Sequence, residues 1–194
     1  FAWPEGAPVL AELSLTIQPG EKVVLLGANG CGKSTLLKLM NGLVFPESGA
    51  IRWDGEPLTQ ARLKQRDFAR RFRSECVLLF QHPEAMLFNP TVREEIAYTL
   101  AKLGRADVAA KVAHWAEELH IAPLLDRAPF NLSGGEKQKV ALAALLALDP
   151  RLLLLDEPGA SLDPATVGWL VDTLVHSDRT VVASTHSLSL AAEL

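Results

Sequence analysis

The chain has 194 residues, of which 48% are hydrophobic and 22% charged, and its formal net charge is −4. This composition predicts a folded domain with a substantial core, excludes a disordered chain and disfavours a nucleic-acid-binding protein, which usually shows a basic face. No apolar run reaches the roughly 20 residues that a membrane-spanning helix needs, and two cysteines without metal-ligand spacing indicate a reducing, cytoplasmic setting.

The first part of the chain is predicted to contain mainly strands. Alternating apolar and polar residues indicate a half-buried strand, whereas short β-branched apolar runs indicate buried ones. One helix, 33–43, shows helical periodicity and is closed by Gly42. An arginine-rich stretch, 62–74, is interpreted as a solvated helix face or loop. The predicted strands lie at 9–17 (half-buried), 22–27 (buried), within 47–58 (flanked by turns) and within 75–81 (buried).

The middle of the chain changes from strands to helices. From Thr91 to Leu148 the sequence predicts three successive helices, at 91–104 with Thr91 as N-cap, at 107–121 and at 134–148. Because no strand separates them, we expect an inserted helical subdomain. The expected division of the chain is a helical part at 88–148 and a core at 1–87 and 149–194.

Alternation resumes at the end of the chain, with a strand in 151–158, a helix in 164–176, a strand in 179–185 and a last helix. Uniformly apolar strands that alternate with helices are typical of a parallel sheet covered on both faces. The sequence therefore predicts an α/β fold.

The stretch 27–34, "GANGCGKS", fits the phosphate-loop pattern and stands between a predicted strand and a predicted helix. Glycines allow the backbone to wrap closely around phosphates, and the following helix directs its positive end at them. Lys33 adds a cation for the outer phosphates, and the Ser34 hydroxyl is a suitable Mg²⁺ ligand. The loop alone predicts only a nucleoside-triphosphate site.

Two carboxylates, Asp156 and Glu157, end the apolar strand "LLLLDEP". A carboxylate pair at the end of a buried strand is costly unless it serves a cation or a reaction. Asp156 is suited to the magnesium shell, and Glu157 to polarising a water for in-line attack on a γ-phosphate. An acidic strand cap is the competing interpretation, which the phosphate loop weakens.

The segment 132–136, "LSGGE", opens a predicted helix. A structural role as helix cap is enough to explain Ser133. It does not explain two glycines in the first turn, because glycine weakens a helix. Here the sequence resembles the ATP-binding cassette (ABC) ATPases. In the family's order, it has the phosphate loop, Gln81 after a strand, "LSGGE", "LLLLDEP", "SLD" at 161–163 and His186 after the strand "VVAST". Glu136 stands where the family most often has glutamine.

The resemblance implies a P-loop NTPase core with a mainly parallel sheet, N-terminal antiparallel strands and an inserted α-helical subdomain, and it implies further strands before Phe1 and beyond Leu194. It also implies the roles of individual residues. Glu157 would be the base, helped by His186, Gln81 and Lys33, and Mg²⁺ would be held by Ser34, Gln81 and Asp156. The expected ATP-binding residues are Trp3 (stacking on adenine), Asn29, Gly30, Cys31, Gly32, Lys33, Ser34, Thr35, Ser133, Gly134, Gly135 and Asp163.

In this family, the segment 132–136 caps the nucleotide of a second chain, and Asp163 lies at the same interface. The resemblance therefore implies a dimer, of identical or paired chains, that holds two ATP molecules. Because ATP contacts the closed dimer better than the open one, its binding favours closure and its hydrolysis to ADP and phosphate reverses it.

The stretch 79–98, "LFQHPEAMLFNPTVREEIAY", is similar to the energy-coupling-factor (ECF) class of importers, although His82 replaces the usual asparagine. The class implies an ATPase on the cytoplasmic face of the membrane. It would bind transmembrane subunits, have no nucleic-acid partner, and power uptake of cobalt, nickel or a vitamin such as biotin. The alternative is an exporter ATPase or a non-transport ABC ATPase.

Overall fold

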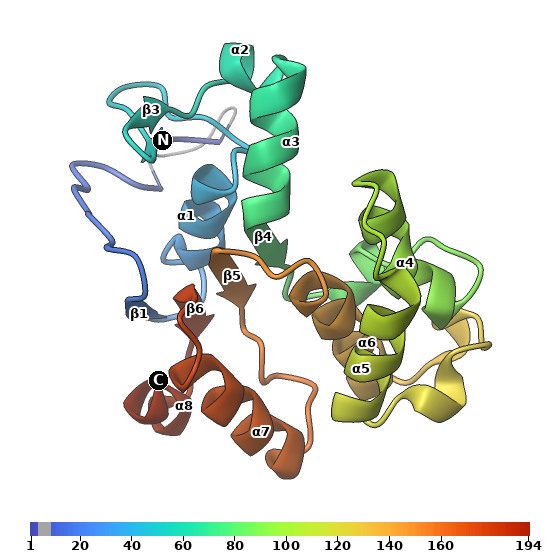
Figure 1. Ribbon diagram of the computed structural model, residues 1–194. Helices are drawn as coiled ribbons and strands as arrows, with labels where there is room; N and C mark the ends of the chain where they lie inside the picture. The colour runs from blue at the N-terminus through green and yellow to red at the C-terminus, as the bar shows by residue number, and fades with distance from the viewer. Residues whose placement is uncertain (4–8) are drawn as a thin grey trace.

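The structure is a computed structural model that describes residues 1–3 and 9–194 (Figure 1). Its main element is a four-stranded sheet of β1 (Lys22–Leu26), β6 (Thr180–Thr185), β5 (Leu152–Asp156) and β4 (Cys76–Leu79), in that order. All three pairings are parallel. This is the parallel α/β sheet that the sequence predicts.

The helices follow the predicted pattern closely. In addition to the four strands, the chain forms a short antiparallel hairpin of β2 (Arg52–Trp53) and β3 (Glu56–Pro57). The α-helices are α1 (Lys33–Met40), α2 (Gln60–Leu63), α3 (Arg66–Glu75), α4 (Val92–Lys102), α5 (Val108–Glu118), α6 (Gly134–Leu146), α7 (Pro164–Val175) and α8 (Leu188–Glu193). Three 3₁₀ turns are η1 (Pro83–Ala85), η2 (Ala122–Leu124) and η3 (Pro129–Asn131).

Both faces of the sheet are covered, because alternate residues of β4 and β5 point into different hydrophobic clusters. Leu78 and Leu154 pack in one cluster with Leu37 of α1 and the phenylalanines of α3. Leu79 and Leu155 pack in the other, with α4, α5, α6 and α7. In Figure 1, α1 and α3 accordingly lie on a different side of the strands from α4, α5 and α6.

Two strand predictions need correction. Residues 9–17 form no strand in the structure, and both Leu13 and Leu15 are about half exposed. An alternating pattern becomes a strand only against a pairing edge. In the described chain, Val9 and Leu10 hydrogen-bond to Phe1, but the backbone of residues 11–17 forms no hydrogen bond to another described residue. The second correction concerns β1, which is half-buried rather than buried because it is the last strand of the sheet.

Helix ends agree with the sequence signals. Thr91 caps α4 by accepting a hydrogen bond from the Glu94 N–H. Gly42 follows α1, where its N–H donates to the Leu39 carbonyl while the Leu43 N–H donates to Lys38, the two bonds of a Schellman motif. Between α4 and α6 the described chain contains helices and turns without a strand, as expected.

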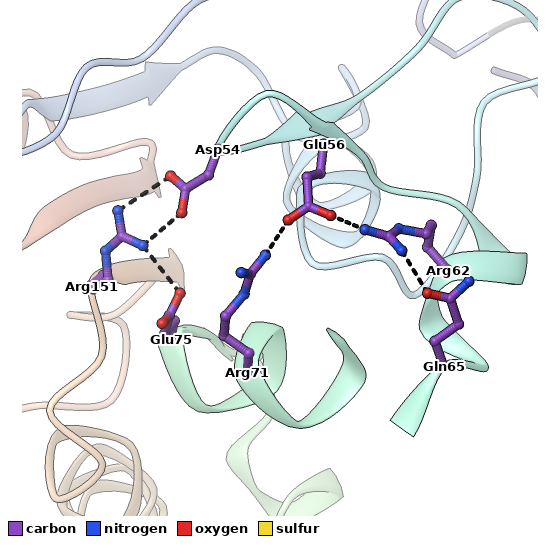
Figure 2. Close-up of polar contacts among 7 residues, drawn as sticks. All are labelled: Asp54, Glu56, Arg62, Gln65, Arg71, Glu75 and Arg151. Atoms are coloured by element: carbon purple, nitrogen blue, oxygen red, sulfur yellow. Dashed lines mark hydrogen bonds and ion pairs between the residues drawn. The ribbon is translucent and has the colours of Figure 1, made fainter. Parts of the chain in front are cut away.

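The hairpin is attached to the rest of the core by ion pairs (Figure 2). Arg151, just before β5, pairs with Asp54 of the hairpin turn at 2.7 Å and with Glu75 at the end of α3 at 3.1 Å. The hydrogen bond from Arg151 holds the pKa of Asp54 below its ordinary value. Arg151 therefore joins three segments that are distant in the sequence.

The arginine-rich stretch falls on α2 and α3. On the β3 side of the hairpin, Glu56 pairs with Arg71 at 2.5 Å and also with Arg62, which donates a hydrogen bond to Gln65 (Figure 2). Arg66, Arg70 and Arg73 are exposed. Part of the stretch is thus a solvated helix face and part is a set of ion pairs. None of the described helices could span a membrane.

Candidate functional site

The predicted catalytic residues come together at one edge of the sheet because its four strands are parallel. The phosphate loop follows β1, and Gln81 follows β4. Asp156 ends β5, and His186 follows β6. The strand register pairs Leu26 with Thr185 and Asp156 with Ser184. The crevice beyond the carboxyl ends of parallel strands is the usual ligand site of open α/β sheets.

The phosphate loop has the backbone that a phosphate cradle needs. Gly32 precedes α1 with φ +98°, which a residue with a side chain rarely adopts, and no side chain caps the helix. The first N–H groups of α1, beginning at Lys33, are therefore available to an anion. The Lys33 ammonium donates to the loop carbonyls of Gly27 at 2.7 Å and Ala28 at 3.2 Å.

The remaining loop residues differ in exposure. Asn29, Gly30 and Cys31 are exposed, Ser34 is half-buried and Thr35 is buried. A Cβ on Gly27 would lie 2.7 Å from the Cys31 sulfur. The Cys31 side chain thus lies across Gly27 within the loop.

Asp156 is 5% exposed and accepts a hydrogen bond from Ser184 Oγ at 2.5 Å. A carboxylate oxygen and the Ser34 hydroxyl are hard oxygen donors of the kind that Mg²⁺ prefers. The donor types therefore fit Mg²⁺, the metal that the resemblance to ABC ATPases implies. The sequence pattern did not predict a role for Ser184, although the strand "VVAST" changes from apolar to polar at this residue.

Glu157 is 7% exposed and has a positive φ of 49°, a strained conformation for a residue with a side chain. Its N–H donates to the carbonyl and the hydroxyl of Ser184, both at 3.1 Å. Its Oε2 lies 2.9 Å from His186 Nδ1, and its Oε1 is buried with no partner among the described residues. The carboxylate thus retains one acceptor for a further donor, such as a water.

Gln81 and Trp3 are less constrained. Gln81 is exposed just beyond β4. Trp3 is 39% exposed, meets Phe1 edge-to-face at 5.1 Å and has the Lys38 ammonium of α1 5.8 Å from its ring centre. Trp3 therefore lies beside the helix that follows the phosphate loop, which is compatible with an adenine site.

Ser133 and Glu136 form a capping box at the start of α6. The Ser133 hydroxyl accepts from the Glu136 N–H, while the Glu136 carboxylate accepts from the Ser133 N–H at 2.8 Å and its hydroxyl at 2.7 Å. These bonds, the hydroxyl's foremost, lower the pKa of Glu136. Among the described residues, no hydrogen bond joins this segment to the phosphate loop of the same chain.

The segment instead contacts the loop that follows Glu157. A Cβ on Gly135 would lie 2.7 Å from the Ser161 carbonyl oxygen. Lys139 of α6 pairs at 3.2 Å with Asp163, which caps α7 by accepting from the Thr166 N–H at 2.9 Å. Hydrogen bonds from Thr166, and then from Lys139, lower the pKa of Asp163. This contact is not predictable from the sequence pattern.

A phosphate loop beside an acidic strand end, with an inserted helix that opens on Ser-Gly-Gly, defines a P-loop ATPase of the cassette type. The ABC transporter family matches residues 10–160. The chain belongs to this family, whose members hydrolyse ATP.

Relatives support the subclass resemblance. The nickel import ATP-binding protein NikO of Rhodobacter capsulatus is 43% identical over 202 residues, which cover 100% of this chain and 79% of NikO. The energy-coupling factor transporter ATP-binding protein EcfA2 of Methanospirillum hungatei is 38% identical over 196 residues, 98% of this chain and 48% of that protein. The resemblance to ECF ATPases is thus confirmed.

The fold also matches a solved dimeric cassette, MJ0796, in a post-hydrolysis state bound to ADP and phosphate. The TM-score is 0.84 at 26% identity, and the match covers 95% of this chain and 83% of MJ0796. The predicted cassette fold is confirmed.

Proposed function

We propose that this chain is the ATP-hydrolysing subunit of an ECF-type importer that takes up cobalt, nickel or a vitamin such as biotin. It would work on the cytoplasmic face of the membrane, paired with a second ATPase chain and bound to transmembrane subunits. The observation that carries the proposal is the convergence of the phosphate loop, Asp156, Glu157 and His186 at one sheet edge. The relatives named for nickel import and energy coupling support the importer class.

In the proposed site, the loop N–H groups and Lys33 bind the triphosphate, while Trp3 stacks on adenine. Asp156, Ser34 and Gln81 would hold Mg²⁺, which when bound supplies charge neutralisation at the phosphates. Glu157 accepts a proton from the attacking water, and His186, 2.9 Å from the carboxylate, keeps its orientation. The base is suited to this because it is buried and retains an unpartnered oxygen.

The second half of the proposed site comes from the partner chain. Ser133, Gly134 and Gly135 would cap the nucleotide of the other protomer, with Asp163 at the same interface. In this proposal 88–148 acts as the helical part and the rest of the chain as the core. The described part of the chain agrees with an intermolecular role, because its α6 start is not hydrogen-bonded to its own phosphate loop.

Replacement of Glu157 tests the enzymatic half of the proposal. Glu157→Gln keeps the side-chain shape but loses the base, so ATP turnover should fall by about 100-fold or more while ATP binding persists. Size-exclusion chromatography with light scattering should show an ATP-dependent dimer. Turnover equal to that of the parent would remove Glu157 from the role of base.

Transport requires its own experiment. The chain is co-expressed with the transmembrane subunits that co-purify with it, and uptake of labelled nickel, cobalt and biotin into cells is measured with the parent and Glu157→Gln. We expect uptake of one of them with the parent only. ATP-dependent export of these substrates would contradict the importer assignment. So would a purified chain that carries no membrane protein with it.

A further inference from the structure

Gln138 is a buried polar residue that the proposed chemistry does not use. It lies on the second turn of α6, is 1% exposed and is followed by the apolar residues Val140, Ala141 and Leu142. Its Nε2 donates to the Pro158 carbonyl at 3.0 Å, and its Oε1 is buried without a partner among the described residues. A half-satisfied buried amide is destabilising, which suggests that its single bond has a purpose.

That bond acts on the main chain next to the proposed base. Pro158 directly follows Glu157, so its carbonyl is the first peptide oxygen after that of the base itself. On the other side, Ser184 holds the Glu157 N–H through two acceptors. Ser184 and Gln138 therefore fix the strained backbone of Glu157, at φ +49°, from both sides.

The helix that carries Gln138 begins with the segment proposed to cap the partner's nucleotide. Its first two turns touch the loop 158–163 at two further points. The Gly135 backbone packs against the Ser161 carbonyl, and Lys139 pairs with Asp163 at 3.2 Å. A displacement of the start of α6 would therefore be transmitted to this loop, and the Gln138 bond is the contact nearest to Glu157.

Given the proposed two-chain ATPase, on which the idea rests, we infer that Gln138 is a positioning residue. It couples the segment 132–136, called the Ser133 segment below, to Glu157 of the same chain. Each chain's Ser133 segment touches ATP in one site, while its Glu157 acts in the other. The Gln138–Pro158 hydrogen bond thereby makes the base of one site depend on nucleotide engagement at the second, so the two sites hydrolyse ATP cooperatively.

The test is Gln138→Met, which keeps the length and packing of the side chain but removes its hydrogen-bond donor. We expect kcat to fall by about ten- to a hundredfold, with KM for ATP within about twofold of the parent. The Hill coefficient should drop from about two toward one. The melting temperature should stay within about 3 °C, and a dimer should still form with ATP in the Glu157→Gln background. Gln60→Met, at an exposed glutamine of α2, is the matched control.

Gln138→Glu provides a second readout that a purely structural role would not change. The ionised carboxylate cannot donate to Pro158, but the protonated form can, and burial favours that form. Its kcat relative to the parent should therefore rise as pH falls from about 8 to about 6. A ratio of Gln138→Glu kcat to parent kcat that does not change with pH would overturn the inference, even if Gln138→Met failed to fold. The inference would also be overturned if Gln138→Met and an active parent had the same kcat and the same Hill coefficient. A parent that hydrolyses no ATP would instead refute the proposed function, and the inference with it.

Discussion

Adding one methyl group to Gly135 tests how α6 packs on the loop 158–163. A Cβ at Gly135 would lie 2.7 Å from the Ser161 carbonyl oxygen, a contact that real Cβ atoms essentially never make. Backbone would have to move on one side or the other, and overpacking of this kind costs about 1–3 kcal/mol. The adjacent Gly134 is a matched control, because its Cβ would meet only Ser161 Oγ at 3.9 Å, an ordinary contact.

Both substitutions to alanine raise helix propensity similarly, so the difference between Gly135→Ala and Gly134→Ala isolates the steric contact. We expect Gly135→Ala to be less stable than Gly134→Ala by about 1–3 kcal/mol, which corresponds to about 3–10 °C in melting temperature for a chain of this length. Thermal and urea unfolding measure the difference in stability between the two variants. Nucleotide is left out so that phosphate binding does not contribute to it. Equal melting temperatures, or a higher one for Gly135→Ala, would refute this packing argument.

Three further changes probe the core and its surface. Burial raises the pKa of Cys76 from 9.0 to about 12, so the stability of the neutral thiol is complete below pH 9 and is lost as pH rises toward 12; by pH 10 the parent should lose about 1.4 kcal/mol of unfolding free energy that Cys76→Ala does not lose. Arg151→Met should cost about 0.5–1 kcal/mol at low salt and nothing in about 1 M salt, because its pair with Asp54 is exposed. Ser184→Ala should cost about 1–3 kcal/mol, because the buried Asp156 oxygen loses its donor.

Each of these predictions has a control and a contrary result. A parent and Cys76→Ala with the same pH dependence would place the thiol in water. For Arg151, the control is Arg73→Met at an exposed arginine of α3, and equal effects of both would show that the ion pairs of Arg151 in Figure 2 add nothing to stability. For Ser184, Ser14→Ala at an exposed serine is the control, and an equally small effect would mean that water replaces the hydroxyl.

Sequence patterns predicted the elements whose signal is local. The run of four leucines at 152–155 predicts a buried strand. Ser133 and Glu136 have the spacing of a capping box, which predicts the start of a helix. The segment 9–17 also had a clear alternating pattern, but a strand needs a partner edge, which is not a local property. The half-buried state of β1 likewise depends on its position at the end of the sheet.

The relative placement of the proposed catalytic residues depends on the strand order, which the sequence pattern does not contain. Because β6 lies between β1 and β5, His186 is brought within 2.9 Å of Glu157, although 29 positions separate them. Ser184 and Gln138 were missed for a related reason. Gln138 stands in the polar stretch 136–139, and Ser184 stands at the polar end of its strand, so neither is conspicuous in the sequence. Only the fold shows the buried group that each one contacts.

The Lys33 ammonium affects how the loop can accept an anion. Carbonyl oxygens such as those of Gly27 and Ala28 would repel a phosphate, but here their partial charge is already offset by the lysine. An ammonium has three N–H donors, so one is left over for an incoming oxyanion once two are engaged with the chain. In the proposed site, the lysine would therefore both hold the shape of the loop and offer an N–H group to the phosphates. Truncating it would change the loop backbone as well as remove the charge.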